Sequence, residues 1–361
     1  MIVPTLMRAV VTTGHGGLDK LVYREDVPVP VAGTGEVLIA VGGCSINNTD
    51  LNTRTGWYAA SVRGGTEVDA TLADAAPWDR KPFAFPRIQG ADIAGRIVGV
   101  GHGVPPSRIG ERVIVDPWMC DPANRLKNPA FVGSERDGGY AEYAAVPSAN
   151  AHRITTTLTD VELATFPCAY TTAENMLQRA GLEPGETVLV TGASGGVGTG
   201  LIQIGAARGA RVVAITSRAK LDQVRTVGVD VAIAREEPDL AQAIAAVTGR
   251  AGVDLWADVV GGSGFPPLFD VIRPGGRYVT SGAIAGPVVE VDLRVLYLKD
   301  ITMYGATVPA ADVFPTLLRR IEAGTIRPIV ARTYPLSRVR EAQVDFASKR
   351  HVGKIVLVPG Q

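Results

Sequence analysis

The sequence predicts an α/β protein of two domains, one a doubly wound parallel sheet and the other a small β-rich, barrel-like domain. Three observations favour this fold class. A glycine-rich turn lies between two apolar runs in residues 187–218, and strand and helix patterns alternate from 187 to about 307. Short strand patterns separated by Gly and Pro dominate the first part of the chain. A length of 361 residues also suits two domains.

Composition and charge narrow the classes of function. Hydrophobic residues make up 46% of the chain and charged residues 20%, which predicts a sizeable core rather than disorder. Lys plus Arg and Asp plus Glu are equal at 36 each, so the charge predicts no nucleic-acid or membrane partner. No apolar run is long enough to span a bilayer, and the first residues do not resemble a signal peptide. Scattered cysteines (Cys44, Cys120 and Cys168) favour a reduced, cytoplasmic protein without disulfides.

The first part of the chain reads as a series of short strands. We expect strands near residues 7–12, 21–25, 35–41, 93–100 and 112–115. The run Val27-Pro-Val-Pro30 is expected to lie outside any sheet, because proline cannot donate to a strand ladder. Residues 44–58 are polar but include Leu51, Trp57 and Tyr58, and predict a short helix that ends near Gly56.

The stretch around residue 193 predicts a dinucleotide-binding turn. Val188, Leu189 and Val190 form a buried strand, and the turn and helix start follow it directly. The turn residues expected to bind the phosphates are Ala193, Ser194, Gly195, Gly196, Val197 and Gly198. Gly195 would let the pyrophosphate approach the backbone, and Gly198 would let the helix pack against the strand. The alternative is a purely structural turn.

The end of the second strand predicts which dinucleotide binds. NAD-specific sites usually have an acidic residue there, whereas this chain has Ser217, Arg218 and Lys220. A hydroxyl and two cations suit a 2′-phosphate, so we expect NADPH as the cofactor. The alternative is that Arg218 and Lys220 are ordinary solvated residues of the next helix.

Further strands are expected near 229–234, 253–260, 277–281 and 301–305, with helices between them. Loops after parallel strands face the ligand in such sheets. Val260, Ser281 and Gly282 lie in those loops, and we expect them to contact the cofactor. The last residues, with a strand at 354–358, should rejoin the first domain.

Several motifs resemble those of the medium-chain dehydrogenase/reductase superfamily, over nearly the whole chain. They are Gly35-Glu-Val-Leu-Ile-Ala-Val41, Asn48-Thr-Asp50, Gln89-Gly-Ala-Asp-Ile-Ala-Gly95, Gly110-Glu-Arg-Val113, the Ala193–Gly198 turn and Val352-Gly-Lys354. The chain most resembles the zinc-free quinone oxidoreductase branch. This resemblance implies a GroES-like β-barrel-type catalytic domain at 1–168 and 309–361, and a Rossmann NADP(H)-binding domain at 169–308.

The resemblance also bears on metal binding. The zinc-dependent branch has a Cys, a His and a Cys at the positions of Asn47, Ala91 and Cys168, and only the third is kept. A catalytic zinc ion needs three protein ligands, which an amide and a methyl group cannot complete. In that branch a cysteine-rich loop that binds a structural zinc ion lies at the position of residues 116–137. Here this segment has a single cysteine, Cys120. We therefore expect no zinc, and Cys168 to be a small buried residue.

Without a metal ion, hydride is best delivered to a carbon activated by conjugation, as in a quinone or an α,β-unsaturated carbonyl. Asn48, Thr49 and Tyr58 have side chains that can donate to the acceptor oxygen, and we expect them to be catalytic. By resemblance, Tyr58 matches an active-site tyrosine of the quinone reductase branch and Thr49 a proton-relay hydroxyl. Thr172 and Lys354 match cofactor-site positions. The alternative is that the first three residues cap or pack a helix.

The expected function is NADPH-dependent, zinc-independent hydride transfer to a quinone or α,β-unsaturated carbonyl. The alternatives are an alcohol dehydrogenase or an enoyl thioester reductase of the same fold, or a non-catalytic NADPH-binding protein. The sequence does not define the acceptor. The resemblance implies a homodimer, paired through sheet edges at residues 300–307.

Residues 59–85 form a long segment without a clear period, where the quinone reductase branch has a shorter connection. We expect this segment to shape the substrate entrance as a lid, with Trp78, Phe83 and Phe85 as its apolar cover. The alternative is a loose surface loop.

Overall fold

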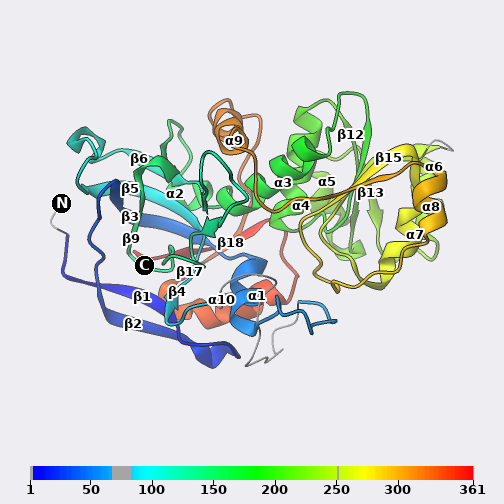
Figure 1. The fold of residues 1–361 in the computed structure, drawn as a ribbon. Coiled ribbons are helices and arrows are strands. Elements are labelled where there is room, and N and C mark those ends of the chain that lie inside the picture. The colour runs from blue at the N-terminus through cyan, green and yellow to red at the C-terminus, as the bar shows by residue number, and fades with distance from the viewer. Residues whose placement is uncertain (1–2, 67–82, 250–251, 361) are drawn as a thin grey trace. The chain divides into compact units, whose positions relative to one another are not determined.

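The computed structural model describes residues 3–66, 83–249 and 252–360, and its contacts divide the chain into two units (Figure 1). The first unit comprises Met1–Val62, Glu67–Cys168 and Pro328–Gln361. The second comprises Arg63–Thr66 and Ala169–Arg327. Most of the segment expected to act as a lid, residues 67–82 with Trp78, lies outside the described residues.

The first unit is built on β-sheets, as the sequence predicts. Its strands are β1 (Leu6–Thr12), β2 (Leu21–Pro28), β3 (Glu36–Ser45), β4 (Arg87–Ile88), β5 (Asp92–Val100), β6 (Arg112–Val115), β7 (Trp118–Met119), β8 (Ala130–Phe131), β9 (Tyr143–Pro147), β10 (Ala151–Arg153), β17 (Val330–Pro335) and β18 (Lys354–Val358). The largest sheet has the order β10-β6-β5-β3-β18-β17, with β9 also paired to β3. β18 therefore brings the end of the chain into this sheet. Smaller sheets have the orders β2-β1-β4 and β7-β8.

The observed β2 is longer than predicted. It continues through Val27 and Pro28, which pair with Met7 and Leu6 of β1, although the prolines were expected to stop it. β2 is at the edge of its sheet, with β1 as its neighbour. Proline is tolerated there because an edge strand has one side that donates to no neighbour.

The helices of the first unit are α1 (Asn48–Thr55), α2 (Asp160–Leu163) and α10 (Val339–Ala347). α1 is the short helix predicted for residues 44–58. It ends at Gly56, which has a φ of 76°, a left-handed conformation that glycine adopts without steric cost. The core beneath α1 includes the fully buried Ile46 and Leu51.

The second unit is a parallel sheet covered by helices. Its strands are β11 (Thr187–Val190), β12 (Arg211–Thr216), β13 (Val231–Ala234), β14 (Val253–Asp258), β15 (Ile272–Thr280) and β16 (Thr302–Gly305). They lie in the order β13-β12-β11-β14-β15-β16, and every neighbouring pair is parallel. This is the doubly wound sheet that the alternating pattern predicts.

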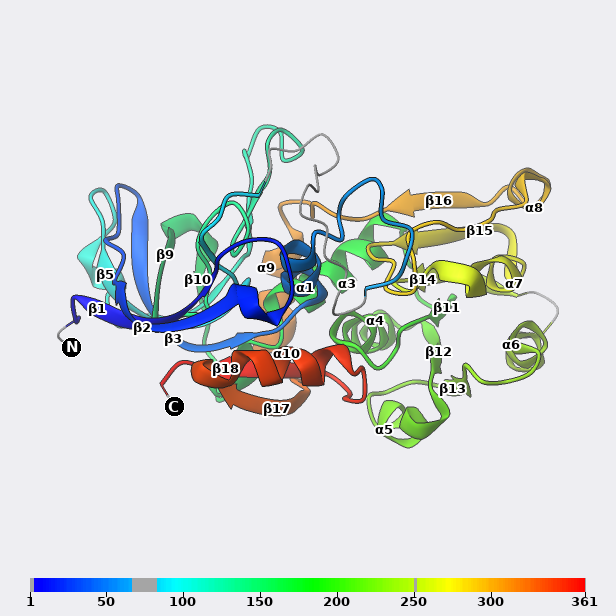
Figure 2. The ribbon, with the colours of Figure 1, turned by 90° about the horizontal axis from the view of Figure 1, so that it is seen from below.

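The helices of the second unit are α3 (Pro167–Arg179, which begins at the end of the first unit), α4 (Gly196–Ala207), α5 (Leu221–Arg225), α6 (Leu240–Thr248), α7 (Phe265–Phe269), α8 (Leu293–Leu298) and α9 (Val313–Glu322). Figure 2 shows α3 and α4 on one face of the sheet and α6 and α7 on the other. Short 3₁₀ turns are η1 (Leu18–Lys20), η2 (Pro106–Arg108), η3 (Ser148–Asn150), η4 (Arg218–Lys220), η5 (Gly262–Gly264) and η6 (Leu336–Arg338). No helix among the described residues is both long and apolar enough to cross a membrane.

The second unit extends further along the chain than the sequence-based division places it. The first boundary, after Cys168, is the same in both, but the second lies after Arg327 rather than after residue 308. The reason is that α9 packs on α3: Arg320 donates to Glu174 at 3.0 Å, and Gln178 donates to Asp312 at 2.8 Å. The apolar periodicity of α9 predicts a helix but not which unit it joins.

Candidate functional site

The turn between β11 and α4 has the geometry of a phosphate-binding loop. Gly192 has a φ of 65°, and its carbonyl accepts a 3.0 Å hydrogen bond from the N–H of Gly195. Gly195 is the N-cap of the 12-residue α4. The free backbone N–H groups at the start of this helix therefore lie at Gly196 and Val197, next to Ser194.

The two glycines assigned separate duties differ in the space around them. A Cβ on Gly198 would lie 2.6 Å from the Cα of the buried Ala193, too close for any side chain. A Cβ on Gly195 would meet only the Gly192 carbonyl oxygen, at 3.6 Å. The fold therefore requires glycine at 198, whereas at 195 it leaves the backbone open to a ligand.

The end of β12 carries the predicted cationic residues. Ser217 is the N-cap of η4, and the Lys220 ammonium donates to the hydroxyl of Ser194 at 3.0 Å. Burial lowers the pKa of Lys220, with a further contribution from Arg235. The structure thus brings the strand end and the glycine turn together, as expected for residues of one cofactor site.

Two acidic residues were missed in this region. The Arg218 backbone N–H donates to Glu236 at 2.8 Å, and its guanidinium donates to Glu237 at 2.9 Å. Both acids follow β13, the strand beside β12, so the parallel register delivers them to the same sheet edge. Sequence reasoning searched only the end of β12, and the strand order was the signal needed to find them.

The loops after β14 and β15 are organised by a buried carboxylate that the sequence reasoning also missed. Asp258 accepts from the N–H of Val260 at 2.8 Å and of Gly261 at 3.0 Å, and from the Tyr278 hydroxyl at 3.1 Å. Burial, and then the Asp258 charge, raise the pKa of Tyr278, which therefore stays a donor.

Two predicted cofactor residues lie in the loop that follows β15. Ser281 and Gly282 follow this strand directly, and the Thr280 hydroxyl donates to the Gly282 carbonyl at 3.0 Å. Thr172, the remaining cofactor residue predicted in this unit, is half-buried on α3.

Part of the segment after Tyr58 packs on the loop that follows β15 in the second unit. The N–H of Thr66 donates to the carbonyl of Ile284 at 2.9 Å, and a Cβ on Gly65 would lie 2.6 Å from that oxygen. Phe83 and Phe85 instead pack near His15 in the first unit, where the Phe85 and His15 rings meet edge to face with centroids 4.8 Å apart.

The predicted donors of the first unit lie on and just after α1. The amide oxygen of Asn48 accepts from the Lys349 ammonium at 2.7 Å. Because an ammonium group can only donate, the Asn48 amide nitrogen points elsewhere and is the atom able to donate to an acceptor. Tyr58 is 42% exposed. Desolvation raises the pKa of its phenol, while hydrogen bonds with Thr49 and Asn52 oppose that rise. The structure therefore gathers Asn48, Thr49 and Tyr58 in one region.

Lys354, predicted to contact the cofactor, is held by partners within the first unit. The side chain is buried, and its ammonium donates to the amide oxygen of Asn47 and lies 3.1 Å from the Asp92 carboxylate. The motif did not predict these partners, because Asn47, the residue before α1, is 307 residues away in the chain.

Asp50 anchors the start of α1. Its carboxylate accepts from the Asn47 N–H at 2.8 Å, the Tyr140 hydroxyl at 2.7 Å and the Gly90 N–H at 3.3 Å. Burial raises the pKa of Asp50 to about 6, because the hydrogen bonds offset only part of the desolvation. These hydrogen bonds hold the start of α1 against Gly90 and Tyr140.

The three positions compared with zinc ligands do not make a zinc site. Ala91 has no donor atom, and the Asn47 oxygen faces Lys354, so of the three positions only Cys168 keeps a ligand atom. Cys168 is half-buried at the start of α3 rather than buried as expected. Within the described part of the chain, no group of three or more His, Cys, Asp or Glu residues could hold a metal ion. This donor set does not fit a catalytic zinc ion.

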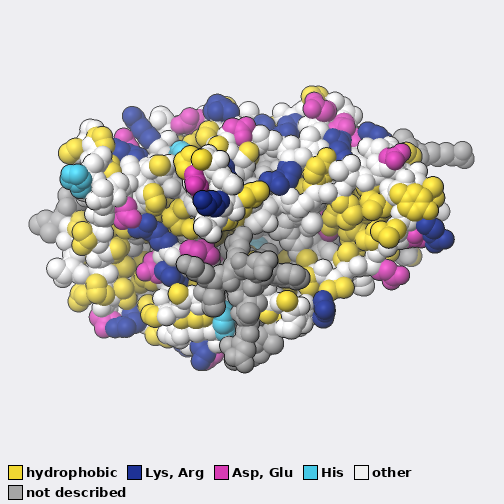
Figure 3. All heavy atoms as spheres, in the orientation of Figure 1, with side chains coloured by type: hydrophobic (Ala, Val, Ile, Leu, Met, Phe, Trp, Pro, Cys, Tyr) yellow, Lys and Arg dark blue, Asp and Glu magenta, His cyan; other side chains and the backbone are white. Residues whose placement is uncertain are grey.

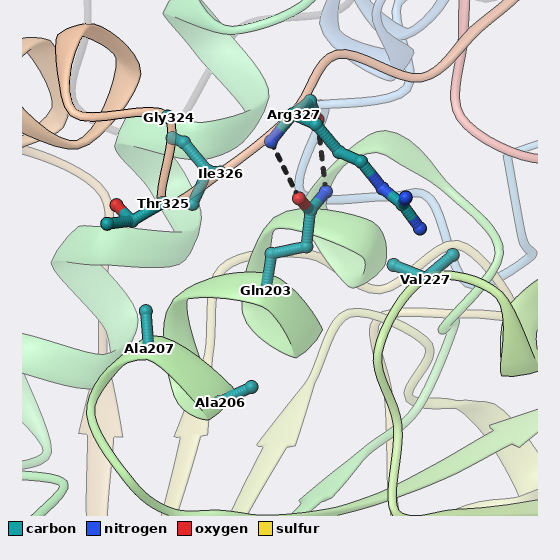
Figure 4. Close-up of a pocket in the computed structure, with 8 residues that line it drawn as sticks. All are labelled: Gln203, Ala206, Ala207, Val227, Gly324, Thr325, Ile326 and Arg327. Carbon is teal, nitrogen blue, oxygen red and sulfur yellow. Dashed lines mark hydrogen bonds between the residues drawn. The ribbon is translucent and has the colours of Figure 1, made fainter.

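A shallow pocket of about 230 Å³ lies elsewhere in the second unit (Figure 4). In it the Gln203 amide pairs with both backbone groups of Arg327, accepting at 2.8 Å and donating at 3.1 Å. None of the predicted site residues lines this pocket, so we do not assign it to the candidate site.

Comparison with known proteins agrees with this fold. Residues 33–156 match the family described as alcohol dehydrogenase GroES-like domain, and residues 196–323 match the family described as zinc-binding dehydrogenase. A crystal structure from Sinorhizobium meliloti 1021, provisionally described as an alcohol dehydrogenase, is 48% identical with a TM-score of 0.92 and covers 99% of this chain and 97% of its own.

Curated relatives carry several activities in their names. An acryloyl-coenzyme A reductase from Metallosphaera sedula is 30% identical, with 97% of this chain and 99% of the relative covered. A quinone oxidoreductase from Lama guanicoe is 29% identical, with 98% of each covered. An NAD-dependent alcohol dehydrogenase from Sulfurisphaera tokodaii is 28% identical, with 95% and 98% covered.

These matches, with the two units observed, define the class: the chain is a nicotinamide-dinucleotide-dependent oxidoreductase. It belongs to the medium-chain dehydrogenase/reductase family.

Proposed function

We propose that this protein uses NADPH to reduce a quinone or an α,β-unsaturated carbonyl without zinc. The observation that carries the proposal is the donor set at positions 47, 91 and 168, in which the Asn47 oxygen is bound by Lys354 and Ala91 has no ligand atom. Alcohol oxidation in this family would need a Lewis acid to stabilise an alkoxide, whereas a conjugated acceptor needs only hydrogen-bond donors.

The cofactor part of the proposal rests on the second unit. The open backbone at Gly195 and the helix start behind it suit a pyrophosphate, and Arg218, Lys220 and Arg235 supply positive charge at the end of β12 and β13. When bound, NADPH would supply the hydride, and the protein's own groups would orient it and balance the phosphate charge.

The acceptor part rests on Asn48, Thr49 and Tyr58. The Asn48 nitrogen is left to donate by the contact of its oxygen with Lys349, and the raised pKa keeps the Tyr58 phenol protonated at neutral pH. An amide N–H and a phenol O–H directed at a carbonyl oxygen stabilise the negative charge that develops during hydride transfer.

NADPH oxidation with a panel of quinones, enones and enoyl thioesters tests the proposal, with NADP⁺ and simple alcohols as the opposing assay. We expect turnover with conjugated acceptors, unchanged by a chelator, and no stoichiometric zinc by elemental analysis. Activity lost to the chelator, or alcohol oxidation as the main reaction, contradicts it.

An enoyl thioester is the second candidate acceptor. The relative of that kind, an acryloyl-coenzyme A reductase, is 30% identical over 364 residues. Its reaction uses the same conjugated carbonyl chemistry, so the Asn48 and Tyr58 donors would serve either acceptor. A kcat/KM for enoyl thioesters well above that for quinones would favour this candidate.

We also propose a homodimer formed through the second unit. β16 is an edge strand, and exposed apolar side chains lie on α8 just before it and on the strand itself: Leu293, Tyr297, Leu298 and Met303. Figure 3 shows apolar side chains gathered on this end of the unit. Light scattering should give twice the chain mass, and Leu298→Glu should give a monomer because it places a charge in the interface. A wild-type monomer at micromolar concentration contradicts this proposal.

A further inference from the structure

Lys354 is a buried cation held by two acceptors from distant parts of the first unit. Its side chain is only 3% exposed. The ammonium donates to the Asn47 amide oxygen, and the Asp92 Oδ2 atom lies 3.1 Å away. All three residues belong to the first unit, so these contacts do not depend on how the two units are arranged.

Asp92 connects this cation to three elements. Its Oδ2 atom accepts from the Asn47 amide nitrogen at 2.8 Å and from the Ser45 hydroxyl, at the end of β3. Its Oδ1 atom accepts from the Cys168 backbone N–H at 2.6 Å, at the start of α3. One carboxylate therefore joins the end of β3, the residue before α1 and the start of α3.

The Asn47 amide can take only one orientation in this network. Its oxygen must face the ammonium, which only donates, and its nitrogen must face the carboxylate, which only accepts. Asn47 is the N-cap of α1, and its backbone N–H donates to Asp50 at 2.8 Å. The ion pair thus determines the side-chain direction of Asn47, the residue just before α1.

Burying an ion pair is costly, and apolar residues of similar volume often replace one without loss of stability. A Lys and an Asp in this core therefore call for a reason other than stability. Specification of one arrangement among several is the best-attested use of such pairs. Here the arrangement concerns the helix that carries Asn48 and Thr49.

We propose that Lys354 is a positioning residue: its ammonium is a built-in cation that holds Asn47 and Asp92 and thereby fixes the start of α1. The effect on catalysis rests on the proposed function, since it acts through Asn48 and Thr49. The effect on α1 itself does not. Because both contacts of the ammonium lie within the first unit, this positioning role does not require contact with the cofactor.

The test uses Lys354→Met, which keeps most of the side-chain volume, and the double variant Lys354→Met with Asp92→Asn, which leaves no unpaired charge. Lys20→Met is the matched control, because Lys20 forms an exposed ion pair with Asp19 at 3.0 Å in the same unit. The measurements are hydrogen exchange of peptides covering residues 45–55, the NADPH dissociation constant, kcat, and the thermal midpoint.

In Lys354→Met we expect exchange in residues 45–55 to rise by about tenfold or more and kcat to fall by a similar factor. NADPH affinity should stay within about twofold of the wild type, a change of under 1 kcal/mol. The double variant should recover the thermal midpoint but not kcat, because nothing then orients Asn47. The Lys20→Met control should match the wild type in every measurement.

Two results overturn the proposal. If the double variant recovers both the thermal midpoint and kcat, Lys354 serves only to neutralise the Asp92 charge and does not position α1. If Lys354→Met weakens NADPH binding by about tenfold, or 1.4 kcal/mol, and leaves exchange in 45–55 unchanged, Lys354 is a cofactor residue. A wild type without turnover refutes the proposed function, and hydrogen exchange then decides this inference alone. If Lys354→Met does not fold, the double variant is measured in its place.

Discussion

The glycine turn after β11 and the start of α1 are two candidate sites built in different ways. The turn is made by one continuous run of backbone, and its required residues, such as Gly192 and Gly198, lie within the same short stretch of sequence. The start of α1 is made by side chains from β5, the loop at Tyr140 and the C-terminal strand β18, which meet at Asn47 and Asp50.

This difference determines what carries each site. At the turn, the geometry depends on the close contact of Gly198 with Ala193 and on the N–H groups at the start of α4. Among the described residues, charged side chains lie only at the edge of the turn. At α1, buried charges hold the geometry, with Asp50 and Asp92 as acceptors and Lys354 as the cation. Variants that act on backbone space should therefore damage the first site, and variants that act on charge the second.

Gly198→Ala should have the largest effect. The added Cβ meets Ala193 Cα at 2.6 Å and cannot be accommodated without moving β11 or α4. We expect a loss of about 3 kcal/mol or more in the free energy of unfolding, together with the loss of NADPH binding. Urea unfolding and fluorescence titration measure the two effects.

Gly195→Ala and Gly264→Ala sharpen this prediction. A Cβ on Gly264 meets nothing within 4 Å, so that variant should resemble the wild type. A Cβ on Gly195 has room in the protein, so Gly195→Ala should keep its stability and lose cofactor affinity. Equal stability of Gly195→Ala and Gly198→Ala would show that the close backbone packing at Gly198 does not stabilise the turn.

The pH dependence of unfolding tests the role of charge at α1. Asp50 has a pKa of about 6 in the folded protein and 3.8 as its ordinary value, so the folded state binds its proton more tightly. Its contribution to stability is therefore present below pH 4 and is lost as the pH rises through about 6. A shift of this size corresponds to about 2–3 kcal/mol. Asp50→Asn should lack this component.

The quantity compared is the difference in the free energy of unfolding between wild type and variant, measured in urea at pH 4.5 and at pH 7.5. The other acidic residues contribute equally to both proteins, so their effects cancel in this difference. Asp116→Asn is the matched control, because burial also raises the pKa of Asp116 to about 6, away from α1. Both variants should lose a similar pH-dependent component, but only Asp50→Asn should change hydrogen exchange in α1. Parallel pH dependence in wild type and Asp50→Asn would contradict the role of this carboxyl.

The same difference explains what the sequence could predict. The turn, its strands and its helix were predictable because periodicity and glycine spacing are local signals. The family was predictable from motifs that are likewise local. The role of Lys354 was not, because its partners Asn47 and Asp92 become neighbours only when β18 pairs with β3. Glu236 and Glu237 were missed for a similar reason, since they reach Arg218 only through the pairing of β12 with β13.

Arg218→Ala should have the next largest effect. The Arg218 guanidinium is largely exposed beside the predicted 2′-phosphate position, and a charge-assisted hydrogen bond of this kind contributes about 1.5 kcal/mol or more. We expect NADPH affinity to fall by about tenfold and NADH affinity to stay the same. Arg225→Ala is the control, because Arg225 forms a similarly exposed pair with Asp222 at 2.7 Å. Unchanged NADPH affinity in Arg218→Ala would refute the cofactor assignment.

Glu237→Gln should have the smallest effect, and its sign separates the two cofactors. Glu237 accepts from Arg218 at 2.9 Å and competes with a 2′-phosphate for that guanidinium. Since exposed ion pairs contribute about 0.2–1 kcal/mol, its removal should tighten NADPH binding by about 1.4-fold to fivefold. NADH binding should not change. Glu341→Gln, which removes an exposed partner of Arg338 in the first unit, should leave both affinities unaltered.

The opposite outcome of Glu237→Gln has a definite meaning. A carboxylate at this edge of the sheet can accept from both ribose hydroxyls of NADH, and its replacement by an amide would then weaken NADH binding. If Glu237→Gln lowers NADH affinity and leaves NADPH affinity unchanged, Glu237 is the ribose-binding acid that the end of β12 lacks. The cofactor would then be NADH, and Arg218 would serve to orient the acid rather than to bind a phosphate.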